Sequence, residues 1–279
     1  MLGQSLYLFV FVLFVLREFS FQVFAAVCGE RACGRLEERQ LYNDNAYAEQ
    51  DEHPWLGRLV YKNQSESFIF HCVAVLLSVR HVLAPASCFK GSKVYEYTPH
   101  AVLFDTSSDC AQASSHARMF KIEKIIVHPD YKNNTLGDDL AVVRLDRDVP
   151  FSAFVQPICM PHSWDGPATF VAANVDLIGY EMGNNTRSRR IKAYAHVSDP
   201  QSCVLRYPET RSQLCGYIKG AELQPGSPLI GVRVEKGLPE NYYLIGNLVG
   251  GYDPSLSAPY LFIFVSPYRN WILDNIHAN

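Results

Sequence analysis

FHCVAVLLSVRHVLAPASCF, which spans Phe70 to Phe89, is a mostly apolar run with a cysteine near each end. Cys72 and Cys88 lie sixteen residues apart, and the residues between them are rich in Val and Leu. β-Branched and other apolar residues favour strands, and the run Ala84-Pro85-Ala86-Ser87 interrupts them. The stretch therefore predicts a strand–turn–strand unit that is closed by a disulfide.

Length and composition indicate one globular domain of ordinary charge. The chain has 279 residues, a formal net charge of −3 and 48% hydrophobic residues. This is enough to build a sizeable core in one domain of about 240 residues. The near-neutral charge gives no reason to expect a nucleic-acid partner.

The N-terminal residues have the pattern of a signal peptide. Leu6 to Leu16 form an unbroken apolar run that is too short to span a bilayer, and Val23-Phe24-Ala25 is an A-x-A-like cleavage site. We therefore predict a signal peptide over residues 1–25 and a secreted, extracellular protein with no membrane contact after cleavage. The run lacks a preceding positive charge, so an uncleaved anchor is the alternative. The chain has eight cysteines, an even number that agrees with an oxidising compartment.

Residues 26–41 follow as a predicted tether. They contain Cys28 and Cys33 and show no periodic apolar pattern. A zinc site would need a matching Cys or His pair, so we favour disulfides for both cysteines. We expect no metal site and no cofactor in the chain.

From Trp55 onward, short apolar runs alternate with turns, which predicts an all-β sandwich or barrel. Near the C-terminus the pattern changes, because apolar residues of Pro267–Ile276 recur at helical spacing. The predicted strands are Leu56–Tyr61, Phe68–Leu77, His81–Ala84, Ala101–Phe104, Met119–Val127, Leu140–Leu145, Val171–Tyr180, Arg190–Val197, Pro228–Val234, Tyr242–Val249 and Tyr260–Val265.

Seven sequence blocks, in order, resemble those of chymotrypsin-like (trypsin-type) serine proteases. The resemblance implies two six-stranded antiparallel β-barrels with a C-terminal helix, over a domain of residues 42–279. One block is similar to a loop of arthropod clip-domain proteases. The blocks are the opening stretch, Glu52-His53-Pro54-Trp55, Phe104-Asp105-Thr106-Ser107-Ser108-Asp109-Cys110, Ile125-Ile126-Val127-His128-Pro129-Asp130-Tyr131, Asp139-Leu140-Ala141-Val142-Val143-Arg144-Leu145, Val155-Gln156-Pro157-Ile158-Cys159-Met160-Pro161, and Pro259–Phe262 with Val265–Ile272.

The same resemblance implies a degenerate catalytic triad. Ser87 stands where the family has its histidine base, and a hydroxyl cannot accept a proton near pH 7 as an imidazole does. Pro225 stands at the nucleophile and lacks both a hydroxyl and the backbone N–H of an oxyanion hole. Leu223 replaces the glycine that supplies the other oxyanion donor. Asp139 occupies the position of the acid, where we expect it to cap a turn.

Other residues could in principle rescue the chemistry. His81 and His71 lie near the base position, and we interpret both as ordinary strand residues. A different alignment would make Ser227 the nucleophile of a divergent, active endopeptidase. That alignment breaks the match of Pro228-Leu229 and still leaves no base, so we favour an inactive chain.

Activation and specificity features are absent from the matching positions. Leu41–Asn45 replaces the activation site and has no basic residue before it. Gln224 replaces the aspartate that would receive the new N-terminus. No cysteine lies in Gly216–Gln224 or Gly250–Ala258, and Val249-Gly250-Gly251 replaces the substrate edge. A formed specificity pocket is therefore not expected.

The resemblance also implies disulfides Cys72–Cys88 and Cys203–Cys215. Cys159 would pair with Cys28 or Cys33, and Cys110 with the other. Three sequons, at Asn63, Asn133 and Asn184, are candidate glycosylation sites in a secreted protein. Arg187, Arg189 and Arg190 form either a cleavage site or a solvated basic loop, and we favour the loop.

These observations predict a secreted, catalytically inactive serine protease homologue. By resemblance it would regulate a clip-protease cascade of innate immunity or melanisation in a haemolymph-like fluid, with clip-domain proteases or other protease homologues as partners. Two upstream cysteines, Cys28 and Cys33, are fewer than the six of a clip domain, so clip-mediated docking is not expected. The alternatives are a protein that recognises microbial surfaces or glycans, and a divergent active serine endopeptidase.

Overall fold

The computed structural model describes residues 33–90, 97–104, 119–133, 137–162, 166–182, 190–199, 212–250 and 259–278. They belong to one compact unit that begins at Cys33. The first residues of this unit include a short helix, α2 (Glu38–Leu41). The amide of Gly34 donates to the Pro157 carbonyl (2.7 Å), and Gly34 accepts from Tyr242 (2.8 Å), so this segment is fixed to the domain.

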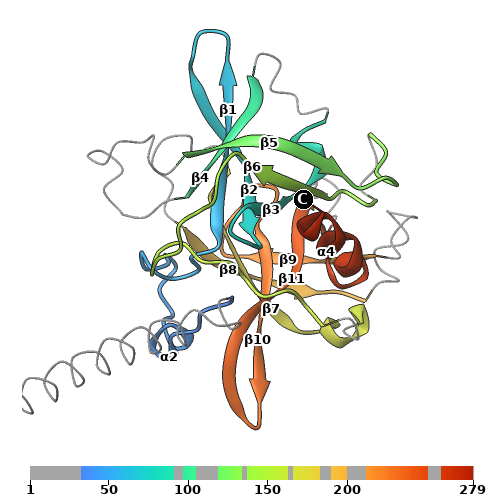
Figure 1. The fold of residues 1–279 in the computed structure, drawn as a ribbon. Coiled ribbons are helices and arrows are strands. Elements are labelled where there is room, and N and C mark those ends of the chain that lie inside the picture. Colours follow the sequence, from blue (N-terminus) through green and yellow to red (C-terminus); the bar gives the residue numbers. More distant parts are fainter. Residues whose placement is uncertain are drawn as a thin grey trace, which may run out of the picture. The chain divides into compact units, whose positions relative to one another are not determined.

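The first barrel is built from the N-terminal half of the domain (Figure 1). Its strands are antiparallel and follow the order β1-β2-β3-β6-β5-β4, and β1 pairs with both β2 and β4 to close the ring. The strands are β1 (Leu56–Asn63), β2 (Phe68–Leu76), β3 (His81–Ala84), β4 (Tyr97–Phe104), β5 (Met119–Val127) and β6 (Ala141–Leu145).

The second barrel repeats this design in the C-terminal half. Its order is β10-β11-β12-β9-β8-β7, and pairing of β7 with β10 closes it. The predicted architecture of two six-stranded antiparallel barrels is therefore confirmed. The strands are β7 (Asn174–Gly179), β8 (Ile191–Val197), β9 (Gln213–Lys219), β10 (Pro228–Glu235), β11 (Leu238–Gly250) and β12 (Tyr260–Phe264).

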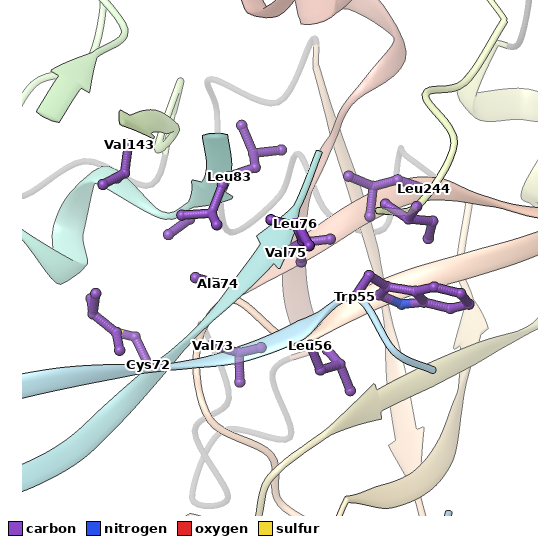
Figure 2. Packing of buried hydrophobic residues seen from close by; sticks show 14 of the residues in the cluster. Trp55, Leu56, Cys72, Val73, Ala74, Val75, Leu76, Leu83, Val143 and Leu244 are labelled. Carbon is purple, nitrogen blue, oxygen red and sulfur yellow. The ribbon is translucent and has the colours of Figure 1, made fainter. Parts of the chain in front are cut away.

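The two barrels share a hydrophobic core. Trp55, which leads into β1, is fully buried in one cluster with Val73 of β2 and Leu244 of β11. Figure 2 shows the Trp55 ring beside Leu244, with Leu76 and Val75 next to them. This shared core explains why the junction between the barrels can hold loop residues in fixed positions.

The predicted C-terminal helix is also present. A 3₁₀ turn (Ser266–Tyr268) leads into α4 (Arg269–His277), which buries Ile272 against the core. The Tyr268 hydroxyl donates to Asp138 Oδ1 (2.6 Å), and the His128 ring lies 4.8 Å from that of Trp271. No helix in the described part of the chain combines the length and the apolarity that crossing a bilayer would require.

Candidate functional site

The turn after β3 carries the first position of the predicted triad. Ser87 lies in a 3₁₀ turn (Ala86–Cys88), and the Cys72–Cys88 disulfide ties this turn to β2. Asp139 lies just before β6, which pairs with β3. This pairing brings the two positions together, and the backbone N–H of Ser87 donates to Asp139 Oδ1 at 2.7 Å.

The carboxyl group of Asp139 is buried in an unfavourable environment. Its side chain is 0% exposed, and Oδ2 has no hydrogen-bond partner among the described residues. Burial raises the pKa of Asp139 to about 6, although the Ser87 amide opposes this rise. Asp139 therefore caps the 3₁₀ turn with one oxygen and keeps the other unpaired, at an energetic cost.

Pro225 lies in a turn that packs directly against this region. Its carbonyl accepts the backbone N–H of Val73 at 2.8 Å. The next residue, Gly226, has φ +88°, and a Cβ atom there would lie 2.0 Å from the Val73 carbonyl oxygen and 3.2 Å from Pro85 Cδ. The backbone of this turn therefore packs directly against β2 and the loop of Ser87. Only glycine fits at position 226, because there is no room for a Cβ atom. The structure therefore brings together Ser87, Asp139 and Pro225.

The residues around Pro225 are occupied in packing. Leu223 is buried in the core of the second barrel, and it forms an isolated antiparallel bridge with Glu181. Gln224 is buried, and its Nε2 donates to the Glu181 carbonyl (3.2 Å). Ser227 is 0% exposed, and its hydroxyl donates to the Gln224 carbonyl (2.7 Å). Ser227 is thus a structural hydroxyl in this fold.

Neither nearby histidine is hydrogen-bonded to Asp139 in the described part of the chain. His81 is buried in β3, and its Nδ1 lies 3.0 Å from Ser78 Oγ. His71 packs with its ring edge toward Tyr61. Burial lowers the pKa of both imidazoles. Their surroundings are those of ordinary strand residues.

The Trypsin family model matches residues 43–272. The chain belongs to this family. It is 30% identical over 255 residues to CLIP domain-containing serine protease B10 of Anopheles gambiae, covering 82% of this chain and 68% of that protein. It is 26% identical to Melanization protease 1 of Drosophila melanogaster, covering 81% and 63%.

A solved structure gives the same fold. The crystal structure of the drosophila Grass clip serine protease of the Toll pathway aligns with a TM-score of 0.68 and 21% identity, covering 89% of this chain and 75% of that one. The likeness supports the trypsin-family architecture of two barrels.

A second polar cluster of this trypsin-family domain was not predicted. Residues 43–53, which we call the strap, precede the first barrel and pair with the start of β8 in the second. The Lys192 amide donates to the Ala46 carbonyl (2.9 Å), and the Ala48 amide donates to the Arg190 carbonyl (3.0 Å). The strap thus forms an isolated antiparallel bridge, Tyr47 with Ile191, at the start of β8.

The side chain of Arg190 binds the backbone of the strap. Its guanidinium is buried and donates to the carbonyls of Gln50 (2.9 Å), Glu52 and His53 (3.1 Å). The predicted solvated loop, and its alternative of an exposed cleavage site, are therefore wrong for Arg190, because its side chain is buried and donates to three carbonyls of the strap. Arg187 and Arg189 lie outside the described residues.

Glu52 anchors the other end of the strap. Its side chain is buried; Oε1 accepts Lys192 Nζ (3.0 Å), and Oε2 accepts Asn43 Nδ2 (3.1 Å) and the Glu49 amide (2.9 Å). Burial alone would raise the pKa of Glu52. Contacts with His53, the Glu49 amide and Lys192 outweigh it and lower the pKa to about 2. In the sequence, this cluster is marked by Glu52, the acidic residue directly before His53-Pro54-Trp55.

Glu52→Gln is expected to lower the free energy of unfolding at pH 7 by about 1–2 kcal/mol, because the amide keeps the shape but loses the charge that Lys192 pairs with. A depressed carboxyl pKa stabilises the fold above the unfolded pKa, and this stability is lost as pH falls from about 4.5 to about 2. Urea melts at pH 7 and pH 3 measure the effect. An equal difference between variant and parent at both pH values would contradict it.

The structure contains two disulfides among its described residues, Cys33–Cys159 and Cys72–Cys88. Cys72–Cys88 is the pairing that the resemblance implied, and Cys33 is the partner of Cys159 from the two candidates that the prediction left open. Cys215 is also disulfide-bonded, whereas its expected partner Cys203 lies outside the described residues, as do Cys28 and Cys110. The described residues include no group of His, Cys, Asp and Glu side chains that could hold a metal ion.

Proposed function

We propose that this chain is a secreted, catalytically inactive member of the trypsin family that regulates an extracellular protease cascade. The proposal depends most on Pro225, which by the sequence resemblance stands at the family's serine nucleophile and lies in a tight turn packed against β2. A proline there supplies neither the attacking oxygen nor an oxyanion N–H. Ser87, in place of the base, contacts Asp139 through its backbone amide and its hydroxyl, and neither group can act as a base near pH 7.

Two further observations support the loss of catalysis. Ser227 is fully buried and already hydrogen-bonded, so a relocated nucleophile at this position has no access to substrate. The strap is docked onto β8 in an uncut chain, and no basic residue directly precedes the stretch that matches the family's activation site. The strap therefore makes its polar contacts with the second barrel in the uncut chain, and these contacts do not need the new N-terminus that cleavage would create.

The relatives support a regulatory role. Their printed names include Melanization protease 1, a CLIP domain-containing serine protease and a clip serine protease of the Toll pathway. A scaffold that keeps the protease fold without the chemistry can still bind the surfaces that such proteases present. We therefore propose clip-domain proteases or other protease homologues as partners, in an extracellular fluid.

Co-purification from host body fluid, before and after microbial challenge, tests this role. We expect clip-domain proteases to be recovered with the tagged protein and enriched after challenge. Adding the purified protein to a clip-protease zymogen and its activator should then change the rate at which the zymogen is cut. Recovery on microbial surfaces, with no protease and no effect on the rate, would overturn the proposal in favour of a surface-recognition protein.

A further inference from the structure

An open groove lies at the free end of the hairpin formed by β1 and β2, which is at the top of Figure 1. Its volume is about 650 Å³. One wall consists of residues 62–65 at the hairpin tip, and the other consists of Tyr97, Thr98 and His100 of β4. The groove is remote in the chain from the family's catalytic positions and has no role in the proposed function.

Asn63 lies in the wall of this groove with one side-chain atom uncommitted. Its Oδ1 accepts the backbone N–H of Ser67 at 2.8 Å. Its backbone carbonyl accepts the Glu66 amide (3.1 Å), so the hairpin turn fixes the residue. Nδ2 makes no hydrogen bond to the residues that the structure describes. In the sequon Asn63-Gln64-Ser65, this nitrogen is the atom that N-glycosylation modifies.

The walls of the groove present little net charge to a ligand. Lys62 Nζ pairs with Glu66 and lies 6.0 Å from the centre of the Phe68 ring. Burial, and then the nearby Lys62 and Lys121, lower the pKa of His100, which keeps its imidazole neutral at physiological pH. A neutral ligand with many hydroxyl groups therefore suits these walls better than an anion.

Aromatic and polar groups in the walls match the two faces of a sugar. Tyr97 is the cross-strand partner of Asn63 in the β1–β4 pairing, so its half-buried ring stands beside the asparagine. A ring in this place can pack against the C–H face of a pyranose. Gln64, Thr98 and His100 offer hydrogen-bonding groups for hydroxyl and acetamido groups.

We propose that Asn63 is N-glycosylated and that the first N-acetylglucosamine of its glycan occupies this groove beside Tyr97. The donor is an oligosaccharide carried on a polyprenyl pyrophosphate. A bond forms between sugar C1 and Asn63 Nδ2, the C1–O bond to the pyrophosphate breaks, and the amide nitrogen loses one proton. The inference rests on the secretion that is part of the proposed function.

Expression in an insect secretory system that makes high-mannose glycans tests the inference. Peptide mass spectrometry should find Asn63 occupied. An endoglycosidase that leaves one N-acetylglucosamine should preserve the thermal midpoint, whereas Asn63→Gln should lower it by about 2–4 °C. Tyr97→Ala should remove this difference between sugar-bearing and sugar-free chains. Asn133→Gln, at a second sequon of the sequence, is the matched control and should have no such coupling to Tyr97.

The outcomes separate this inference from the proposed function. If the protein is secreted and Asn63 carries no glycan, the inference about Asn63 is wrong and the proposed function is unaffected. Occupied Asn63 with no change in thermal midpoint, or with no coupling to Tyr97, would overturn the packing of the sugar in the groove. A chain that never reaches the medium would instead contradict the proposed secretion.

Discussion

Arg190→Ala is expected to lower the free energy of unfolding by about 4 kcal/mol. The guanidinium is buried and donates to three carbonyls of the strap, at Gln50, Glu52 and His53. Each buried acceptor that loses its partner costs about 1–3 kcal/mol, and a cavity is left beside a charged cluster. The strap should loosen from β8, because its other contacts there include only two backbone bonds and the bonds of Lys192 Nζ to Asn43 and Glu52 among the contacts described here.

Equilibrium unfolding in urea and hydrogen exchange of the strap amides measure this effect. Arg147→Ala is the matched control, since Arg147 is half-exposed and pairs with Asp146 at the surface. We expect that control to change stability by less than about 0.5 kcal/mol. An Arg190→Ala chain that is as stable as the control, with unchanged exchange at Ala48, would show that the Arg190 guanidinium does not hold the strap.

Asp139→Asn is expected to raise the free energy of unfolding at pH 7.5 by about 2 kcal/mol. In an active protease this carboxylate would orient a base, but no histidine among the described residues hydrogen-bonds to it. Its Oδ1 accepts the Ser87 amide, and asparagine keeps an oxygen for that bond. Its Oδ2 is buried and unpaired among the described residues, so replacing a charge with a neutral amide removes a desolvation cost.

The stabilisation by Asp139→Asn should grow as pH rises, for a reason that follows from the pKa of Asp139. Burial raises the pKa of Asp139 to about 6 from 3.8, so the folded chain holds a proton that the unfolded chain releases. Stability of the parent should therefore fall as pH rises from about 4 to about 6, and remain lower above that. Parent and variant should be equally stable near pH 4. A variant that is less stable than its parent at pH 7.5 would show that the charge of Asp139 is compensated and used.

Most of the fold could be predicted from the sequence because its strands are strongly apolar. Met119–Val127 and His81–Ala84 were predicted with their observed bounds. The prediction missed β9 (Gln213–Lys219), where Gly216 and polar end residues break the apolar pattern. Only the pairing of β9 with β8 and β12 makes that segment a strand.

The candidate site could be predicted in part. Motif order predicted that Ser87, Asp139 and Pro225 belong to one site, and the structure brings their segments together; their assignment to the triad positions stays a prediction. The strap could not be predicted, because its contacts join Glu52 to Lys192 and the 50–53 backbone to Arg190 across well over a hundred residues. Isolated basic residues in a polar loop give no sign that one of them will be buried.

Reaction with a serine-directed fluorophosphonate, followed by intact mass measurement, tests the absence of catalysis most directly. The secreted protein is assayed before and after treatment with a trypsin-like activating protease, with an active trypsin-family enzyme as the positive control and Ser227→Ala as the matched variant. We predict no covalent adduct in either state and no hydrolysis of peptide substrates. A stoichiometric adduct on one serine, above all one that Ser227→Ala abolishes, would contradict the loss of catalysis and show that this domain is an enzyme.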